Sequence, residues 1–304
     1  MPREFINPGG SGSVNLALTG GTGMLGGAIL AAALHAGHRV RALCRTRPDA
    51  SPDLPTAGLD WVEGRLEDPA SAAELLRGTD AVLHCAYCPT DDPETFVQAN
   101  IAGTLRLLAG TPATGARQFV FVSSLAVFGP EPWSLPGADR LPLDEDFPLW
   151  PRDFYGAHKL ALEKMVIAAA GVTDCNTSAF RVGCVLGRHR DPARDHLARF
   201  RHEAMHSGAI REHFGAYVIA AEDAAAILVG ALGDPTVRGR VFHTFDRWLD
   251  FADLQGPLTL AVGRPVSVHC ERAPEPSPGL RRDRLDARAP VFRTDAAIIE
   301  LLAD

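Results

Sequence analysis

A tyrosine and a lysine one helical turn apart are the side chains of this 304-residue chain best suited to proton transfer. Tyr155 and Lys159 begin a segment with a helical pattern that runs to about Ala170, so both side chains lie on one face. A free phenol has a pKa near ~10, and a nearby cation favours its phenolate. The spacing predicts an acid–base pair, in which Lys159 lowers the pKa of Tyr155. An exposed tyrosine–lysine pair on a helix surface has the same spacing.

Two serines end an apolar stretch earlier in the chain. Residues Phe119–Val122 read as a buried parallel strand, and Ser123 and Ser124 follow it. In open α/β sheets, ligands bind beyond the carboxyl ends of the strands, so we expect Ser123 and Ser124 to face the same crevice as the glycine-rich turn near the N-terminus. The alternative is that the serines end the strand by hydrogen bonding to the backbone.

A glycine-rich turn follows the first apolar run. Val14–Thr19 is followed by Gly20, Gly23 and Gly26, and then by the helical pattern of residues 24–36. The first glycine permits a tight turn, the second lets the backbone approach a pyrophosphate, and the third allows close packing of helix and strand. The helix N-terminus attracts negative charge. The order of strand, turn and helix therefore predicts a dinucleotide site.

The elements that position these residues alternate along the chain. Strands are predicted near residues 14–19, 39–44, 59–63, 80–84, 117–122 and 175–180, with helical patterns between most of them. This alternation predicts an α/β fold with a Rossmann-type, doubly wound parallel sheet. We expect a leader over residues 1–13, a dinucleotide-binding domain over 14–182 to which 220–245 returns, and a small mixed substrate lobe in 183–304. Residues 129–152 are predicted to form a flap over the substrate.

The second predicted strand indicates the form of the cofactor. An acidic residue at its end would bind the ribose hydroxyls of NAD, whereas an arginine can bind a 2′-phosphate. Arg45 and Arg47 follow the strand, and no acid does. NADP is therefore favoured and NAD stays possible, because the arginines can equally be surface charges.

Together these motifs resemble the extended short-chain dehydrogenases/reductases, also called the NAD-dependent epimerase/dehydratase family. Thr19–Gly26 resembles the cofactor turn of that family, Ser124 its catalytic serine, and Tyr155 with Lys159 its YxxxK pair. The resemblance implies that Ser124, Tyr155 and Lys159 are catalytic and that Tyr155 and Lys159 also contact the nicotinamide ribose. Weaker similarities imply further cofactor contacts. These are Thr22, Met24, Leu25, Leu66, Asp68, Cys85, Ala86, Asn100 and Arg181.

The resemblance implies hydride transfer at a carbonyl or hydroxyl carbon. It leaves two substrate classes open, namely nucleotide sugars and other carbonyl compounds. Arg181-Val182-Gly183-Cys184 lacks the proline and asparagine of the RPxN motif that nucleotide-sugar enzymes carry. Ala126–Gly129 is nevertheless more similar to the sugar-epimerase branch, in which NAD is retained. The chain is therefore expected to be an NAD(P)-dependent oxidoreductase or an epimerase/dehydratase. A non-catalytic NAD(P) sensor is the alternative from another class.

Composition excludes several other classes of protein. The net charge of −7 gives no reason to expect nucleic acid as a partner, and no apolar run is long enough to cross a bilayer. The six scattered cysteines suit reduced thiols, so a cytoplasmic location is expected. Residues 100–108 and 155–170 have apolar stripes, and in the resembled family these helices commonly pair across a twofold axis. The resemblance therefore implies a homodimer that acts on a small molecule, although both stripes could simply cover the sheet.

Two motifs have the spacing of metal ligands. His202-Glu203-Ala204-Met205-His206 matches the helical motif of zinc proteases, and Cys85 and Cys88 form a CxxC. The histidine motif falls between the sixth strand and the C-terminal lobe of an enzyme with a different expected architecture. The CxxC has no second cysteine pair nearby, so no metal is expected at either motif. Whether His202 or His206 has a role stays open.

Overall fold

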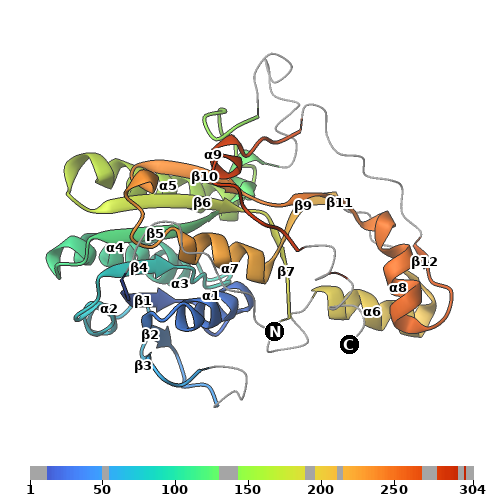
Figure 1. Ribbon diagram of the computed structural model, residues 1–304, viewed down its shortest axis with the longest axis horizontal. Coiled ribbons are helices and arrows are strands. Elements are labelled where there is room, and N and C mark those ends of the chain that lie inside the picture. Colours follow the sequence, from blue (N-terminus) through green and yellow to red (C-terminus); the bar gives the residue numbers. More distant parts are fainter. Residues whose placement is uncertain are drawn as a thin grey trace. The chain divides into compact units, whose positions relative to one another are not determined.

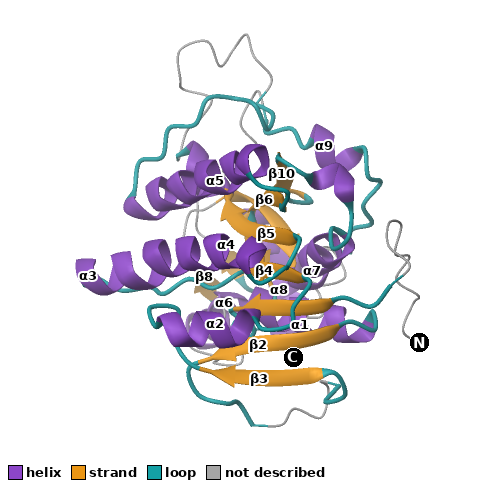
Figure 2. Cartoon of the chain, turned by 90° about the vertical axis from the view of Figure 1, so that its left-hand side faces the viewer, coloured by secondary structure: helices purple, strands orange, loops and turns teal. Residues whose placement is uncertain are grey.

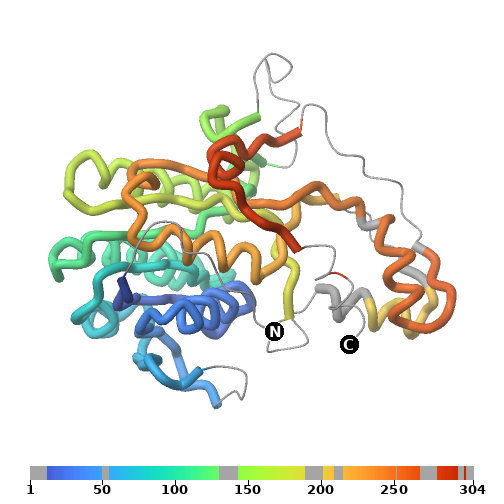
Figure 3. The backbone as a smooth tube through the Cα atoms, in the orientation of Figure 1, coloured from blue at the N-terminus to red at the C-terminus, as the bar shows by residue number. Residues whose placement is uncertain are grey.

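The computed structural model describes residues 12–49, 55–129, 143–188, 196–210, 215–268, 279–293 and 298. The chain divides into two compact units. Unit 1 comprises Met1–Pro130, Leu149–Arg181 and Ala225–Phe242, and unit 2 comprises Glu131–Pro148, Val182–Ala224 and His243–Asp304. The chain thus leaves unit 1 after Arg181 and returns to it at Ala225 (Figure 3).

A seven-stranded sheet forms the centre of unit 1 (Figure 1). Its strands, in chain order, are β1 (Asn15–Thr19), β2 (Arg39–Cys44), β3 (Leu59–Glu63), β4 (Ala81–His84), β5 (Gln118–Ser124), β6 (Asn176–Val182) and β10 (Arg240–Thr244). They lie in the order β10-β6-β5-β4-β1-β2-β3, and the pairs from β5 to β3 are parallel. Since the strand order reverses direction at β1, the predicted doubly wound sheet is confirmed.

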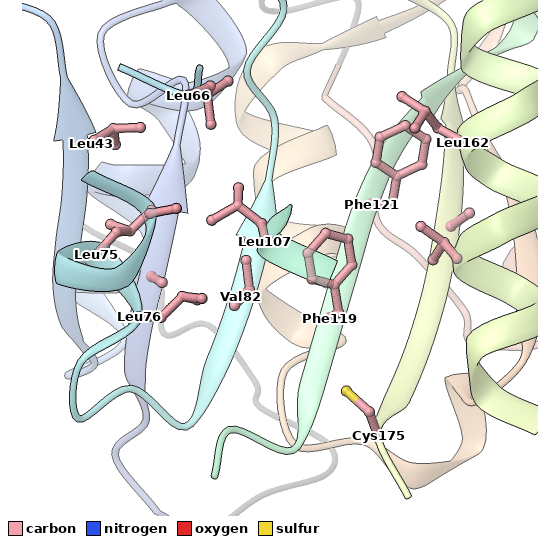
Figure 4. Packing of buried hydrophobic residues seen from close by; sticks show 14 of the residues in the cluster. Leu43, Leu66, Leu75, Leu76, Val82, Leu107, Phe119, Phe121, Leu162 and Cys175 are labelled. Carbon is pink, nitrogen blue, oxygen red and sulfur yellow. The ribbon is translucent and has the colours of Figure 1, made fainter. Parts of the chain in front are cut away.

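Helices cover both faces of this sheet (Figure 2). One face carries α2 (Pro69–Leu76), α4 (Gly103–Ala113) and α5 (Phe154–Val172), whereas α1 (Met24–His35) lies on the other. Because both faces are covered, the central strands are almost continuously buried rather than alternating. Figure 4 shows Val82, Phe119 and Phe121 of the sheet packed with Leu107 of α4 and Leu162 of α5.

The helix predicted around residues 100–108 differs from a regular α-helix. After α3 (Pro93–Phe96), residues Val97–Ala102 form a π-helix, η1, which continues into α4. A π-helix inserts an extra residue per turn and often marks a functional site. Hydrophobic periodicity does not distinguish this local widening from an ordinary helix.

Unit 2 contains a small mixed sheet of β7 (Cys184–Leu186), β9 (Gly215–Ala220) and β11 (Arg247–Asp250). The β9–β11 pair is antiparallel and the β7–β9 pair parallel, so the predicted mixed lobe is confirmed at the level of architecture. A parallel pair of β8 (Ala209–Ile210) and β12 (Ser267–Val268) also occurs. The remaining helices are α6 (His196–Ser207), α7 (Ala221–Gly230), α8 (Gln255–Val262) and α9 (Asp283–Asp286), of which α7 contributes to both units.

Three expectations fall partly or wholly outside the described residues: the leader at its first eleven residues, the flap at residues 130–142, and much of the C-terminal segment. Within the described part of the chain, the helices lack the combination of length and apolar character needed to span a bilayer.

Candidate active site

The turn between β1 and α1 brings backbone into contact with backbone. Gly20 has φ +79°, and a Cβ there would lie 2.8 Å from the Ala86 nitrogen. A Cβ on Gly26 would lie 1.9 Å from the Gly20 oxygen, so neither position accepts a side chain. Gly23 donates its N–H to Gly20 O at 2.9 Å and precedes the first residue of α1, where it supplies no capping side chain. The backbone N–H groups at this helix start fit the pyrophosphate of a dinucleotide.

A buried hydrogen-bond chain fixes the loop that follows β4. The ring of His84 lies between two hydroxyls, with Nδ1 2.6 Å from Thr19 Oγ1 and Nε2 2.7 Å from Thr104 Oγ1. Thr104 donates its proton to Asn100 O, so its oxygen accepts from Nε2–H and Nδ1 accepts from Thr19. The Thr19 oxygen then accepts from the N–H groups of Cys85 and Ala86. Burial lowers the pKa of His84 to about 3, so the ring is neutral at physiological pH.

The structure brings the three predicted catalytic side chains together at the end of β5. The hydroxyl of Ser124 accepts the N–H of Ala126 at 3.2 Å and lies near enough to Tyr155 to lower the pKa of its phenol. Lys159 lies one turn further along α5, and its Nζ donates to Val122 O at 2.8 Å. The same Nζ lies 5.9 Å from the centroid of the Tyr155 ring. Sheet and helix therefore place a hydroxyl, a phenol and an ammonium group within one small region.

The pKa of Tyr155 differs from what the spacing predicts. Burial raises it, the hydrogen bond from Ser124 lowers it, and the negative forms of Tyr87, Cys85 and Asp153 raise it further. Lys159 does not reverse this balance, because its ammonium group is directed to Val122 O. Burial also lowers the pKa of Lys159 itself to about 8. In this state Tyr155 is a protonated phenol, which suits a proton donor.

A buried network, which the sequence analysis did not include, lies directly behind these residues. Glu163 Oε2 accepts from Ser123 Oγ at 2.9 Å and from Arg181 Nε at 3.0 Å, and Oε1 accepts from Arg181 Nη2 at 2.7 Å. Both charged side chains are almost fully buried, and the guanidinium lies 5.4 Å from the centroid of the Phe128 ring. The network joins β5, α5 and β6. In the sequence, the network was indicated only by the position of Glu163, an acid on the apolar face of a helix one turn after Lys159.

Arg181 was predicted as a cofactor contact, and the structure gives its guanidinium a partner inside the protein. Two other predicted cofactor residues also have internal partners. Asp68 caps α2 by accepting from the N–H groups of Ala70 and Ser71, and Asn100 holds the backbone of Cys88. Leu66 is buried, whereas Thr22, Arg45 and Arg47 are exposed. Met24, Leu25, Cys85 and Ala86 are partly exposed around the glycine turn.

The motifs with metal-ligand spacing gain no further ligands among the residues that the structure describes. His202 and His206 lie side by side on α6, with ring centroids 3.9 Å apart, and His206 Nδ1 lies 2.9 Å from His202 O. No cluster of three or more His, Cys, Asp or Glu side chains suited to a metal occurs in the described part of the chain. Cys85 and Cys88 are free thiols.

The sequence of residues 16–220 matches the model of the NAD dependent epimerase/dehydratase family. The chain belongs to this family. Among curated relatives, it is 31% identical over 160 residues to the 2-alkyl-3-oxoalkanoate reductase of Stenotrophomonas maltophilia, a match that covers 51% of the chain and 46% of that protein. It is 30% identical over 161 residues to the UDP-glucose 4-epimerase of Streptomyces lividans, covering 50% and 46%. The chain thus spans about half the length of these two relatives.

Solved structures confirm that the epimerase/dehydratase fold extends along the chain. The UDP-glucose 4-epimerase of Thermus thermophilus, in complex with NAD, matches with a TM-score of 0.75 at 21% identity, covering 95% of this chain and 97% of that one. A short-chain dehydrogenase/reductase superfamily protein from Agrobacterium tumefaciens with bound NAD matches with a TM-score of 0.73 at 23% identity, covering 95% and 96%. At these identities the likeness shows the fold.

Proposed function

We propose that this protein is an NADP-dependent reductase of carbonyl compounds, with Ser124, Tyr155 and Lys159 as its catalytic residues. The observation that carries the proposal is the placement of Ser124 at the end of β5 beside Tyr155 and Lys159 of α5, with Lys159 Nζ 5.9 Å from the centroid of the Tyr155 ring. A carbonyl oxygen that accepts hydrogen bonds from both hydroxyls is polarised for reduction. Family membership and the similarity to 2-alkyl-3-oxoalkanoate reductase support this class of reaction.

Each of the three side chains has a distinct role at the reacting carbonyl. When bound, the reduced nicotinamide supplies a hydride to the carbonyl carbon. Tyr155 donates its proton to the carbonyl oxygen, so the product is an alcohol. Lys159 stabilises the phenolate that this transfer leaves, and Ser124 holds the oxygen in place. The phenol then regains a proton from solvent.

The cofactor is assigned to the β1–α1 turn, where Gly20 and Gly26 allow tight backbone packing and the N–H groups at the start of α1 can bind a pyrophosphate. Tyr155 and Lys159 would hold the nicotinamide ribose, a role that requires Lys159 Nζ to leave or share Val122 O. Arg45 and Arg47 are exposed immediately after β2, where a guanidinium can pair with a 2′-phosphate. Neither forms an ion pair with another residue in the described part of the chain. These features favour NADP over NAD.

A nucleotide-sugar epimerase with retained NAD is the second candidate. The 30% identity to a UDP-glucose 4-epimerase and the match to the NAD complex of the Thermus enzyme favour it. Such an enzyme would purify with NAD bound and would not consume added cofactor. Identification of the dinucleotide released on denaturation separates the two candidates, because a reductase exchanges NADP with the surrounding pool.

Tyr155→Phe tests the assignment of the proton donor. Loss of the hydroxyl should reduce turnover of a ketone panel by about 10²- to 10⁴-fold, because general acid catalysis contributes that much. NADP should still bind, with an affinity reduced by no more than about tenfold in calorimetry, because only one hydrogen bond to the ribose is lost and Lys159 stays in place.

Tyr217→Phe is the matched control, because it removes a phenol of unit 2 that accepts a hydrogen bond from the Leu280 N–H. It should retain turnover. A Tyr155→Phe variant with full activity would show that another group supplies the proton.

A further inference from the structure

Tyr87 is an exposed aromatic side chain beside the proposed proton donor, and it takes no part in the proposed proton transfer. It lies three residues after β4, at the carboxyl end of the sheet. Its side chain is 37% exposed. Its ring centroid lies 5.0 Å from that of Tyr155, with the two rings nearly perpendicular at 77°.

Other aromatic rings support Tyr87 from within unit 1. The imidazole of His158 stacks against it at 5.4 Å and an interplanar angle of 23°, and Phe96 meets it edge-on at 6.4 Å. His158 also contacts Tyr155 and Phe96, at 5.4 and 5.1 Å. Burial lowers the pKa of His158 to about 4, so this support is an uncharged ring at neutral pH. We call Tyr87, Phe96, Tyr155 and His158 the aromatic cluster.

The backbone on both sides of Tyr87 is fixed. The N–H of Ala86 donates to Thr19 Oγ1 at 3.2 Å. The backbone of Cys88 is held twice by Asn100, whose Oδ1 accepts from Cys88 N at 2.8 Å and whose Nδ2 donates to Cys88 O at 2.9 Å. Asn100 lies in the π-helix η1. An exposed ring with this much support is preorganised for binding, because little conformational freedom remains to be lost.

Resting on the proposed reductase function, we propose that Tyr87 is a substrate-contacting residue that selects carbonyl compounds with an aromatic or other planar apolar group next to the carbonyl. A carbonyl oxygen bound to Tyr155 brings its substituent within reach of the Tyr87 ring, since the two centroids are 5.0 Å apart. Stacked or edge-to-face contacts with such a ring give planar groups a binding free energy beyond that expected from their buried area alone. Burial raises the pKa of Tyr87, and the negative forms of Cys88 and Asp153 raise it further, so an anionic group at this position would be repelled.

The test compares Tyr87→Ala and Tyr87→Phe with the wild type on acetophenone and 2-octanone, ketones of equal carbon count. An aromatic contact of about 0.5–1.5 kcal/mol corresponds to roughly 2- to 12-fold. Tyr87→Ala should therefore reduce the ratio of kcat/KM for acetophenone over 2-octanone by about that factor. Tyr87→Phe should keep the ratio, because it keeps the ring. Phe154→Ala, which removes a 78% exposed aromatic side chain that packs on Phe96, should also keep it.

A binding measurement separates this inference from the proposed function. The affinities of both ketones for the complex of the protein with NADP⁺ are measured by ligand-observed NMR for the same variants. If no ketone is reduced and Tyr87→Ala still selectively weakens acetophenone binding, the reductase function fails and the role of Tyr87 stands. The proposed role of Tyr87 is wrong if ketones are reduced or bound and Tyr87→Ala changes kcat/KM or affinity equally for acetophenone and 2-octanone. It is also wrong if the wild-type protein shows no preference for acetophenone. Thermal unfolding confirms that each variant is folded.

Discussion

The carboxylate of Glu163 accepts three hydrogen bonds inside unit 1, two of them from Arg181. Ser123, its third donor, is the neighbour of Ser124 in β5, and Glu163 lies one turn after Lys159 in α5. The pair therefore connects the strand and the helix that carry the proposed catalytic residues. Its charges stay compensated only while both partners are present.

Glu163→Gln should decrease the free energy of unfolding by about 3–5 kcal/mol, because it leaves the Arg181 charge buried without its counterion. Urea denaturation measures the change. Glu74→Gln is the matched control: Glu74 pairs with Arg41 and Arg77, but its side chain is 43% exposed. The control should lose far less stability, because solvent screens an exposed ion pair. Equal losses in the two variants would contradict a special contribution of the buried pair.

Replacement of both Arg45 and Arg47 by alanine should weaken NADP binding by about 10- to 100-fold, since charge-assisted hydrogen bonds contribute about 1.5–3 kcal/mol. NAD binding should change little, because NAD lacks the 2′-phosphate. Calorimetric titration with both dinucleotides measures the effect. Arg39→Ala, at the opposite end of β2, serves as the control for loss of surface charge. Unchanged NADP affinity in the double variant would refute the role of the two arginines.

Between elements, the close approach of α5 to the turn after β5 determines the geometry of the site. That turn, η2 (Leu125–Phe128), is capped by Ser124. A Cβ on Gly156 would lie 2.4 Å from Ala126 O and 3.0 Å from Pro151 Cβ. Since Gly156 directly follows Tyr155, its missing side chain lets the helix carry the phenol up to Ser124.

Gly156→Ala should force α5 away from η2 and reduce turnover by about 10²-fold, the typical effect of a displacement near 1 Å. Steady-state kinetics and thermal unfolding measure the outcome. Gly171 lies in the same helix, and a Cβ there would meet nothing within 4 Å. Gly171→Ala should keep activity and stabilise the protein by about 0.5–1 kcal/mol. A fully active Gly156→Ala variant would show that the helix can shift without cost.

For the molecule as a whole, the neutral His84 couples stability to pH. The pKa of its side chain falls from 6.5 to about 3 on folding, so between these values the unfolded chain binds more protons than the folded one. The free energy of unfolding should therefore decrease as the pH is lowered through this window, by up to about 1.4 kcal/mol per pH unit from this group.

Urea denaturation between pH 4 and pH 7 measures this slope. His84→Asn should give a shallower slope than the wild type, because it removes the buried imidazole. An identical slope for His84→Asn would mean that other groups account for the pH dependence.

The sequence by itself determined the parallel α/β fold, its strands and its family, because these depend on local patterns. Apolar runs, glycines at fixed spacing and a helical period each follow from which residues neighbour one another in the chain. The predicted strand ends lie within two residues of those in the structure. Four expectations stay predictions: the domain boundaries, the site residues, the cytoplasmic location and the homodimer. For the homodimer, Phe154 and Met165 on α5 are exposed apolar side chains, as a dimer face requires.

Tertiary structure alone decided what each polar side chain contacts. It pairs Arg181 with Glu163, directs Lys159 to Val122 O, raises the pKa of Tyr155, and places Tyr87 against His158 and Tyr155. These contacts join strands and helices that are far apart in the chain, and burial sets the pKa values. Neither can be obtained from spacing along the sequence, because both depend on how the elements pack and on how much water their packing excludes.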